Sequence, residues 1–373
     1  MNKYVGLLAT VGLATAPAMA LAAAPSLSDV FVSSGITAAG YIDGSYVDGF
    51  NDGKTIAGHT FDTNSNTFEL NQAALTLSYL PTDGFGGMVN VIAGSDASVI
   101  NGSYGSGTSD FALTQAYVQW AHGNFTVIGG RFVTLSGFEV IDDTKNVNIS
   151  RSLLFQNAEP LVHTGVRASY KFSDVITAYL GLSNSALSGT AVDDDKHKTV
   201  ETGVVITPSS TVTIAATNYY GVDDRAGSNA NTDLLDVVAS LQATKTLQLA
   251  LNGDYSRVSG GGADAYVAGV AAYANLQVTD SLKGSLRGEY LTSKNTFGEG
   301  KVHLEELTLT ADYAATSSFD VLGEVRYDFS GDRIYPDGVT DDGDGGTFDK
   351  FSHSQGEVLL KAIWKFGTPV PTT

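Results

Sequence analysis

The chain has 373 residues, of which 40 are acidic and 21 basic, and its net charge is −19. An acidic balance of this size argues against a nucleic-acid-binding protein, which needs a basic surface, and against attachment to anionic lipid through a basic patch. The sequence contains no Cys, which excludes disulfides and Cys-ligated metal sites. With 42 Gly, 17 Tyr, 17 Phe and only 16% charged residues, the composition is typical of a β protein.

The first predicted element is an N-terminal export signal, residues 1–22. Lys3 precedes an apolar segment, 5–13, and small residues at Ala18, Ala20 and Ala22 have the spacing at which signal peptidase cuts. The apolar segment is too short to span a bilayer, and a buried N-terminal helix is the alternative interpretation. We expect removal of 1–22 to leave one mature domain, 23–373, with one basic residue fewer and a net charge of −20.

Alternation of apolar and polar residues with period two recurs along the rest of the chain and predicts β-strands. In AALTLSY, residues 73–79, Leu75 and Leu77 share one face while Thr76 and Ser78 share the other. No later segment has the 18 consecutive apolar residues of a helical membrane span. The predicted strands are 34–47, 67–79, 85–95, 110–121, 124–133, 163–172, 175–184, 198–207, 211–220, 234–243, 246–257, 264–276, 281–292, 303–314, 318–329 and 355–366.

The connections between these strands alternate in length. Even-numbered strands lead to the next strand through a few residues, whereas odd-numbered strands are mostly followed by longer segments, of which 134–162 is the longest. A transmembrane barrel has this asymmetry, because its periplasmic turns are short and its outer loops are long. The predicted fold is therefore all-β, a transmembrane antiparallel β-barrel of about 16 strands, and a barrel of this size leaves an aqueous channel.

Aromatic residues gather beside both sets of connections. Membrane interfaces hold amphipathic rings in such girdles, although aromatics also simply favour strands. Beside the short turns lie Tyr79, Phe85, Trp120, Phe125, Tyr170, Phe172, Tyr273, Tyr313, Phe319, Trp364 and Phe366. Toward the other rim lie Tyr46, Phe68, Phe111, Phe132, Tyr219, Tyr255, Tyr266, Tyr290, Tyr327 and Phe329.

The long connection 134–162 is the candidate constriction of the channel. Its apolar residues Leu153, Leu154 and Phe155 would be costly to display to water as a cluster, so we expect the loop to fold inward and pack on the inner wall. Acidic residues of the loop would then lie opposite Arg residues and set the field in the lumen. The candidate constriction residues are Arg131, Asp142, Asp143, Arg151, Glu159, His163 and Arg167.

The same region carries a family resemblance. GGRFVTLSGFEV (129–140), NISRSLLF (148–155) and EPLVHTGVRASY (159–170) resemble the signature region of OmpL-like β-barrel porins, which are outer-membrane proteins of Gram-negative bacteria. The resemblance implies export to the outer membrane and passage of small solutes. It also implies outer-membrane lipids, lipopolysaccharide and small hydrophilic solutes as partners, and a homotrimer by analogy with sixteen-stranded porins.

The polar phase of the later strands predicts the rest of the lumen wall. Its candidate residues are Arg287, Glu289, Glu306, Asp312, Glu324, Arg326, Glu357 and Lys361. Arg287 with Glu289, and Glu324 with Arg326, are same-face neighbours two residues apart, which favours ion pairs within a solvated interior. A direct role in selecting ions is the alternative for this group.

Other chemistry is weakly supported. Asp341, Asp342 and Asp344 lie among glycines, as in calcium loops, but the Glu that closes such a loop is missing, so a solvated outer loop is favoured. His353 and Ser354 are adjacent and would point to opposite faces of a strand, which is no catalytic dyad.

The sequence thus predicts a porin, with no catalytic residue, metal or cofactor expected. We expect passive diffusion of small hydrophilic solutes and ions with a mild cation preference. The alternative is a structural or receptor barrel with a plugged lumen, and an outer-membrane hydrolase is a more distant third.

Overall fold

The computed structural model describes residues 31, 33–52, 55–103, 107–187, 196–223, 230–260, 262–296, 300–341 and 347–367. The predicted export signal, and Asp342 and Asp344 of the acidic loop, lie outside the described residues. No helix in the described ranges is long and apolar enough to cross a membrane.

The strands are β1 Thr37–Gly49, β2 Thr67–Tyr79, β3 Gly84–Ala93, β4 Phe111–His122, β5 Phe125–Val133, β6 Val162–Lys171, β7 Ile176–Ser183, β8 Thr199–Ser209, β9 Val212–Asp223, β10 Ala230–Gln242, β11 Leu247–Gly260, β12 Ala263–Gln277, β13 Leu282–Lys294, β14 Lys301–Thr316, β15 Phe319–Ser330, β16 Tyr335–Asp341, β17 Thr347–Ser352 and β18 Ser354–Gly367. The helices are α2 Ser95–Ser103, α3 Leu153–Asn157 and the short 3₁₀ helix η1 Asp143–Lys145.

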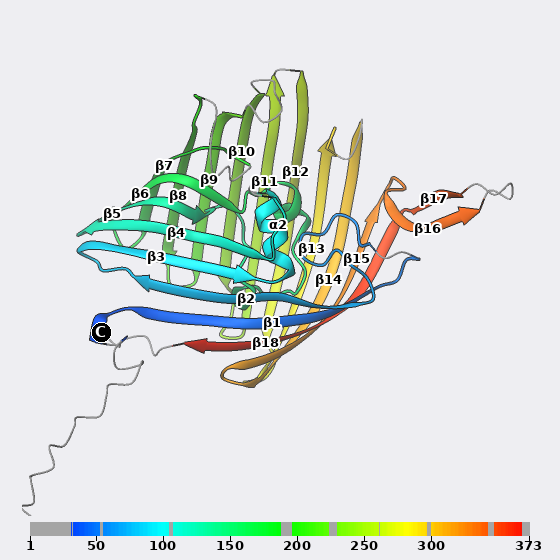
Figure 1. Cartoon of the computed structure of the whole chain (residues 1–373), viewed down its shortest axis with the longest axis horizontal. Coiled ribbons are helices and arrows are strands. Elements are labelled where there is room, and N and C mark those ends of the chain that lie inside the picture. Colours follow the sequence, from blue (N-terminus) through cyan, green and yellow to red (C-terminus); the bar gives the residue numbers. More distant parts are fainter. Residues whose placement is uncertain are drawn as a thin grey trace, which may run out of the picture.

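Strands β1 to β15 and β18 form one closed barrel in which every neighbouring pair is antiparallel (Figure 1). The first strand closes the ring by pairing with the last, with Tyr41 opposite Lys365 and Asp43 opposite Ile363. Closure leaves no strand edge without backbone partners, as hydrocarbon requires. The predicted antiparallel barrel of about 16 strands is therefore confirmed.

The barrel places apolar side chains outside and polar side chains inside. On β14, Leu307 and Leu309 are 54% and 60% exposed, whereas the alternating residues Glu306, Thr308 and Thr310 are at most 3% exposed. This is the reverse of a soluble β protein and fits a barrel whose outer face contacts lipid. The period-two pattern of the sequence follows from this arrangement, because successive residues of a strand point to opposite faces.

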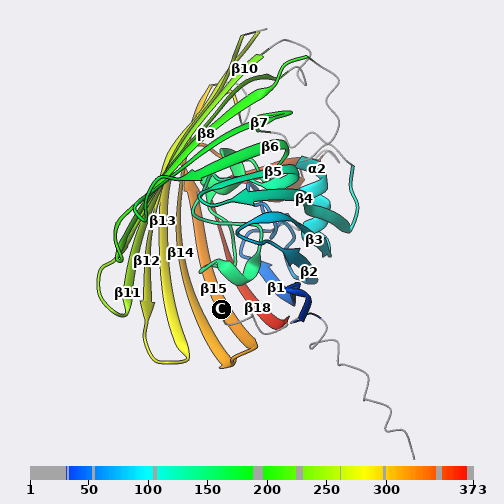
Figure 2. The same cartoon turned by 90° about the vertical axis from the view of Figure 1, so that its left-hand side faces the viewer.

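The two rims differ as the loop lengths predicted. Short turns join β12 to β13 and β14 to β15 at the lower end of the barrel (Figure 2). The aromatic girdles differ from the prediction at Tyr273, Phe132 and Tyr219, which are buried instead of facing outward. These three rings belong to the inward phase of their strands, and Tyr273 packs on Phe138 of the long loop with ring centres 4.5 Å apart.

Two features were absent from the predicted strand pattern. The predicted strand 85–95 ends at Ala93, because Gly94 has a φ of 134° that breaks the extended backbone, and helix α2 follows. The predicted loop 330–354 contains the hairpin β16–β17, which pairs only with itself and projects beyond the barrel (Figure 1).

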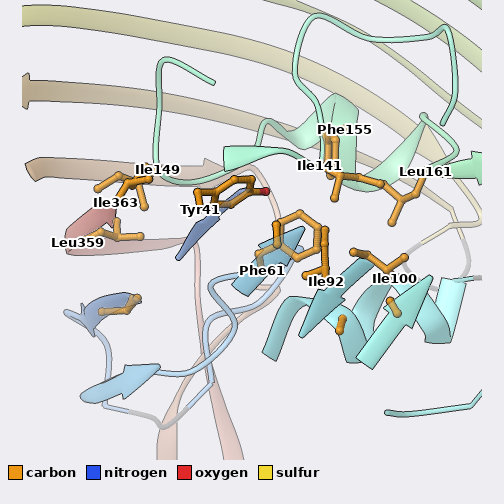
Figure 3. Packing of buried hydrophobic residues seen from close by; sticks show 14 of the residues in the cluster. Tyr41, Phe61, Ile92, Ile100, Ile141, Ile149, Phe155, Leu161, Leu359 and Ile363 are labelled. Carbon is orange, nitrogen blue, oxygen red and sulfur yellow. The ribbon is translucent and has the colours of Figure 1, made fainter. Parts of the chain in front are cut away.

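The interior of the barrel contains apolar packing, which the long loop provides. Phe155 and Ile141 of that loop pack with Phe61, Ile92 and other residues in one cluster (Figure 3). Leu153 and Leu154 of the same loop pack in a second cluster against the wall strands β11 to β14. The loop therefore lies within the barrel.

Candidate channel constriction

The inward loop, residues 134–161, connects β5 to β6 and contains η1 and α3. Ser152 caps α3 by accepting a hydrogen bond from the Phe155 amide at 3.0 Å, and Asp142 caps η1 by accepting one from the Thr144 amide at 3.0 Å. Such caps satisfy amides that have no partner inside the helix. The caps keep both short helices formed although each is too short to be stable alone.

Glu289 of β13 anchors the start of α3 to the wall. Its two carboxylate oxygens accept hydrogen bonds from the Leu153 amide at 2.9 Å and from the Leu154 amide at 3.2 Å. Gly269 of the neighbouring strand β12 leaves room for this helix, because a Cβ there would lie 2.9 Å from Cδ2 of Leu154. A helix N-terminus favours a carboxylate, so this predicted wall residue acts as a support for the loop.

Arg287 of β13 is the centre of a buried charge network. Its guanidinium lies 2.8 Å from Glu306, 2.6 Å from Glu139 of the inward loop and 3.4 Å from Glu289. It also donates to the Ser150 carbonyl at 2.8 Å. One fully buried cation thus joins two wall strands to the loop, and the predicted pair of Arg287 with Glu289 is part of this network.

Glu324 and Arg326 of β15 bind the middle of the inward loop. Glu324 accepts hydrogen bonds from the Ile149 amide at 2.7 Å and the Ser150 amide at 2.9 Å. Arg326 donates to the Arg151 carbonyl at 2.6 Å and pairs with Asp328 at 2.7 Å. The two residues therefore differ from the predicted ion pair, because each uses its charge on a separate partner.

Asp143 joins the first half of the loop to β18. It forms buried ion pairs with Arg151 of the same loop and with Lys361, which also lies 3.7 Å from Asp43. Burial would raise the pKa of Asp143, but Lys361 and Arg151 outweigh burial and hold its pKa below the usual value. Asp143 is therefore a carboxylate at neutral pH, and Arg151 pairs within the loop instead of across the channel.

Arg167 of β6 pairs with the wall and not with the loop acids. Its guanidinium makes two hydrogen bonds to Glu201 of β8, at 2.6 and 2.7 Å, and lies over the Phe132 ring with 4.2 Å to the centroid. His163 is buried beside it, stacked on Tyr219 with ring centres 4.6 Å apart. Of the three predicted arginines, Arg151 thus pairs with Asp143 within the loop and Arg167 pairs with Glu201 of the wall.

Glu357 of β18 belongs to a further cluster, around His59 of the β1–β2 connection. The ring of His59 lies 2.7 Å from Asp62, 2.7 Å from Asp328 and 3.2 Å from Glu357. Burial and Arg326 would lower the pKa of His59, but the three carboxylates outweigh both and raise its pKa well above the usual value. His59 is therefore an imidazolium that ties the first outer connection to the wall.

The remaining predicted residues lie apart from these networks. Arg131 is half-buried near the end of β5, opposite Thr164. Asp312 is half-buried on β14 and lies 3.5 Å from Lys283. Glu159 is buried beside wall carboxylates, and Asp142 with Lys145 of η1 lines a cavity between the loop and the β2–β5 wall.

Several buried charged residues of the interior were not predicted. Those on strands, such as Glu201, share the inward phase of polar residues, so the alternation that identified Glu306 would also have identified them. Those on connections have no periodic signal. The additional residues are Asp43, His59, Asp62, Asp96, Glu139, Glu201, Asp236, Asp254 and Asp328.

Glu324→Ala is expected to loosen the middle of the inward loop. The change leaves the Ile149 and Ser150 amides without their acceptor, at a cost of about 1–3 kcal/mol for each buried group. Single-channel recordings of the variant are expected to show larger current fluctuations than the wild type. Asp280→Ala, in the exposed β12–β13 turn, is the matched control, and equal noise in both variants would contradict the anchoring role.

Asp96 of α2 is expected to make stability depend on pH. Burial, and then Asp143, raises its pKa from 3.8 to about 7, while Gln72 donates to it at 2.8 Å. A raised carboxyl pKa means that the folded state binds the proton more tightly, so this contribution to stability falls as pH rises from about 4 to about 7. Asp96→Asn is expected to raise the urea midpoint at pH 8 and to leave it nearly unchanged at pH 4.5. An equal gain at both pH values would show that titration of Asp96 is not the cause.

Comparison with known proteins agrees with this architecture. The family model described as "Putative beta-barrel porin-2, OmpL-like" matches residues 35–366. Comparison with curated proteins gives no match.

Solved structures share the fold at low identity. The anion-selective porin from Comamonas acidovorans has a TM-score of 0.63 and 14% identity, covering 89% of this chain and 99% of its own. The trimer form of in-vitro folded OmpT, an outer membrane protein of Vibrio cholerae, has a TM-score of 0.61, 14% identity and coverage of 89% and 99%. The outer membrane channel DcaP of Acinetobacter baumannii has a TM-score of 0.59, 14% identity and coverage of 89% and 97%.

At these identities the solved structures support the barrel fold alone. The family match is of a different kind, because it spans the sequence from the first strand of the barrel to the last. The chain belongs to the beta-barrel porin-2, OmpL-like family, and is an outer-membrane porin.

Proposed function

We propose that this porin is a passive channel for small hydrophilic solutes and ions with a mild preference for cations. The observation that carries the preference is the charge of the interior. Among the described buried side chains, 14 are Asp or Glu, five are Arg or Lys, and the imidazolium of His59 adds a sixth positive charge. Charged side chains near a pore select the ions of opposite sign, so this excess favours cations. We further propose that the mature protein is the single domain 23–373, formed after removal of residues 1–22.

The preference is proposed to be mild because many of the interior charges are paired. Each buried Arg or Lys forms an ion pair with at least one carboxylate. The positive charge of the pair reduces the electric field that its carboxylate exerts on ions in the channel. Charge on the outer loops adds little, since it is screened beyond about 8 Å at physiological salt.

Planar-bilayer recordings of the purified, refolded chain test the channel itself. Discrete conductance steps are expected, and reversal potentials across a KCl gradient are expected to indicate a K⁺ permeability moderately above that of Cl⁻. Persistent absence of steps would reject the channel, whereas steps with Cl⁻ preference would reject only the proposed selectivity.

Arg151→Ala combined with Arg167→Ala is expected to strengthen the cation preference. The double change removes the cations that pair with Asp143 and Glu201, so two carboxylates lose a compensating charge. The shift of the reversal potential toward the K⁺ equilibrium value is the measurement. An unchanged reversal potential would mean that neither pair contributes to the field in the channel.

A structural or receptor barrel with a plugged lumen is the second candidate. The observation that favours it is the number of anchors on the inward loop, which is held by β13, β15 and β18 and packs in two apolar clusters. Deletion of part of the loop separates the two candidates, as described in the Discussion.

We propose no enzymatic activity for the chain. His59 is the His with carboxylate partners deep in the barrel, and both of its ring nitrogens already face carboxylates at 2.7 Å. A Ser-activating His needs one ring nitrogen for the Ser hydroxyl, so this arrangement supports a structural role.

We also propose a homotrimer embedded among outer-membrane lipids and lipopolysaccharide. The support is the solved trimer form of the structurally similar Vibrio cholerae OmpT. Crosslinking of the refolded protein, combined with migration before and after heating, is expected to show a species of three chains that dissociates on heating. A single-chain species throughout would reject the trimer.

A further inference from the structure

Three carboxyl groups meet where the end of the inward loop touches strands β10 and β11. Asp236 of β10 and Asp254 of β11 lie directly opposite each other in the antiparallel register. Glu159 of the inward loop reaches the same point, and Gly137 of that loop lies so close to its carboxylate that a Cβ there would overlap it. The exposed fractions of Glu159, Asp236 and Asp254 are only 9%, 0% and 5%.

The three carboxylates have little to compensate their charge. Asn252 donates to Oδ2 of Asp236 at 2.9 Å and to Oδ2 of Asp254 at 3.3 Å. Among the described ion pairs, none joins an Arg or Lys to any of the three. Like charges placed directly opposite on neighbouring strands are destabilising, and buried carboxylates need a cation or hydrogen-bond donors.

Each of the three carboxyl groups has one oxygen without a hydrogen-bond partner. In the described part of the chain, Oε2 of Glu159, Oδ1 of Asp236 and Oδ1 of Asp254 are buried without a hydrogen-bond partner. The described contact of the Glu159 carboxyl group is with the carboxyl group of Asp254, which supplies no positive charge. An orphaned set of acceptors at one point is the pattern that a bound cation would satisfy.

The geometry fits one calcium ion. One oxygen from each of the three side chains lies within 4.8 Å of the other two. Ca²⁺ binds carboxylate oxygens at about 2.3–2.6 Å, so two ligands of one ion are at most about 5 Å apart. The ion's remaining positions would be filled by water, which porin interiors contain. The group His59, Asp62 and Glu357 is less suitable, because its members already pair with one another.

We propose that Glu159, Asp236 and Asp254 bind a calcium ion that fastens the inward loop to β10 and β11. The ion supplies the positive charge that the cluster lacks. It holds the loop at β10 and β11, whereas Glu324 of β15 and Lys361 of β18 hold it without a metal. The loop is then attached at both ends of its path across the lumen.

Equilibrium dialysis of radiolabelled Ca²⁺ against the refolded full chain in detergent, without lipopolysaccharide, tests the proposal. One ion per chain is expected. Glu159→Gln and Asp236→Asn are each expected to weaken binding about tenfold or more, because Ca²⁺ affinity follows the number of charged ligands. Migration before and after heating reports whether each variant is folded.

The acidic loop 336–346 supplies the matched control. Asp342→Asn combined with Asp344→Asn removes two carboxylates elsewhere in the chain and is expected to leave Ca²⁺ binding unchanged. Loss of binding in this control, with binding retained in Glu159→Gln, would overturn the proposed site. No saturable binding to the folded wild type would equally overturn it, and would mean that the three carboxylates share protons instead. These measurements involve no conductance, so they are independent of the proposed channel function.

Discussion

Deletion of residues 141–159 is expected to raise the single-channel conductance several-fold. The deletion removes η1, α3 and the apolar residues that pack in the lumen, while leaving the sixteen barrel strands intact. A barrel of about 16 strands without an inward loop encloses a wide aqueous channel. Planar-bilayer recordings of wild type and variant, at equal salt, measure the effect.

The same experiment decides between a channel and a plugged barrel. If the protein is a porin, the wild type conducts ions and the variant has a higher conductance. If it is a plugged barrel, the wild type shows no conductance and only the variant conducts. Deletion of 336–351, which removes most of the hairpin that lies outside the barrel sheet, is the control and is expected to leave the conductance unchanged. Equal conductance of wild type and the 141–159 variant would mean that the loop does not limit the passage.

Arg287→Met is expected to destabilise the folded barrel by about 3–5 kcal/mol. The change keeps a long side chain but leaves Glu139, Glu289 and Glu306 without their shared cation in a buried position. Removing one partner of a buried charge network costs this much because the remaining charges stay desolvated. Urea unfolding in detergent micelles, followed by loss of β-sheet circular dichroism, measures the change.

Two further variants isolate the cause of this loss. Arg287→Lys keeps a positive charge but loses the fork that contacts several carboxylates, so an intermediate loss is expected. Lys283→Met, on the same strand, removes a cation that is largely exposed and is expected to cost less than about 1 kcal/mol. A loss as large in Lys283→Met as in Arg287→Met would show that burial of the network is not the cause.

The barrel could be predicted from the sequence because its strands obey one strong rule. Every strand alternates between lipid and lumen, so residues such as Leu307 and Glu306 reveal their faces through period two alone. The predicted strand ends were less accurate: the predicted strand 234–243 begins at Ala230, and 303–314 runs from Lys301 to Thr316. The added residues at 230–233 are Ala-Asn-Thr-Asp, which lack the large apolar side chains that mark the rest of the strand.

The constriction was predicted less well, because loop contacts have no periodic signal. The apolar residues Leu153, Leu154 and Phe155 do indicate inward packing, since a loop has no other place to bury them. The partners of the charged residues could not be inferred. Arg151 contacts Asp143, eight residues away, whereas Arg287 contacts Glu139 from 148 residues away, and only the folded path of the loop brings these side chains together.

The charged residues of the strands were also expected to line the aqueous lumen of the channel. In the structure most of them are used to hold the loop: Glu289 and Glu324 bind backbone amides, and Arg326 binds a backbone carbonyl. A backbone partner leaves no trace in a sequence pattern, since every residue has an amide and a carbonyl.

Pairing of the first strand with the last has a consequence for the order of assembly. The register joins Asp43 to Ile363, so the ring cannot close until almost the entire chain has been synthesised and exported. Until then β1 and β15 each keep one row of unpaired amides and carbonyls, which attract foreign strands. Ring closure between such distant segments is also slow, because the entropy lost in bringing them together is recovered only when the contacts form. The incomplete chain is therefore the species most prone to aggregation. Its unpaired strand edges must be covered until β18 pairs with β1 and β15.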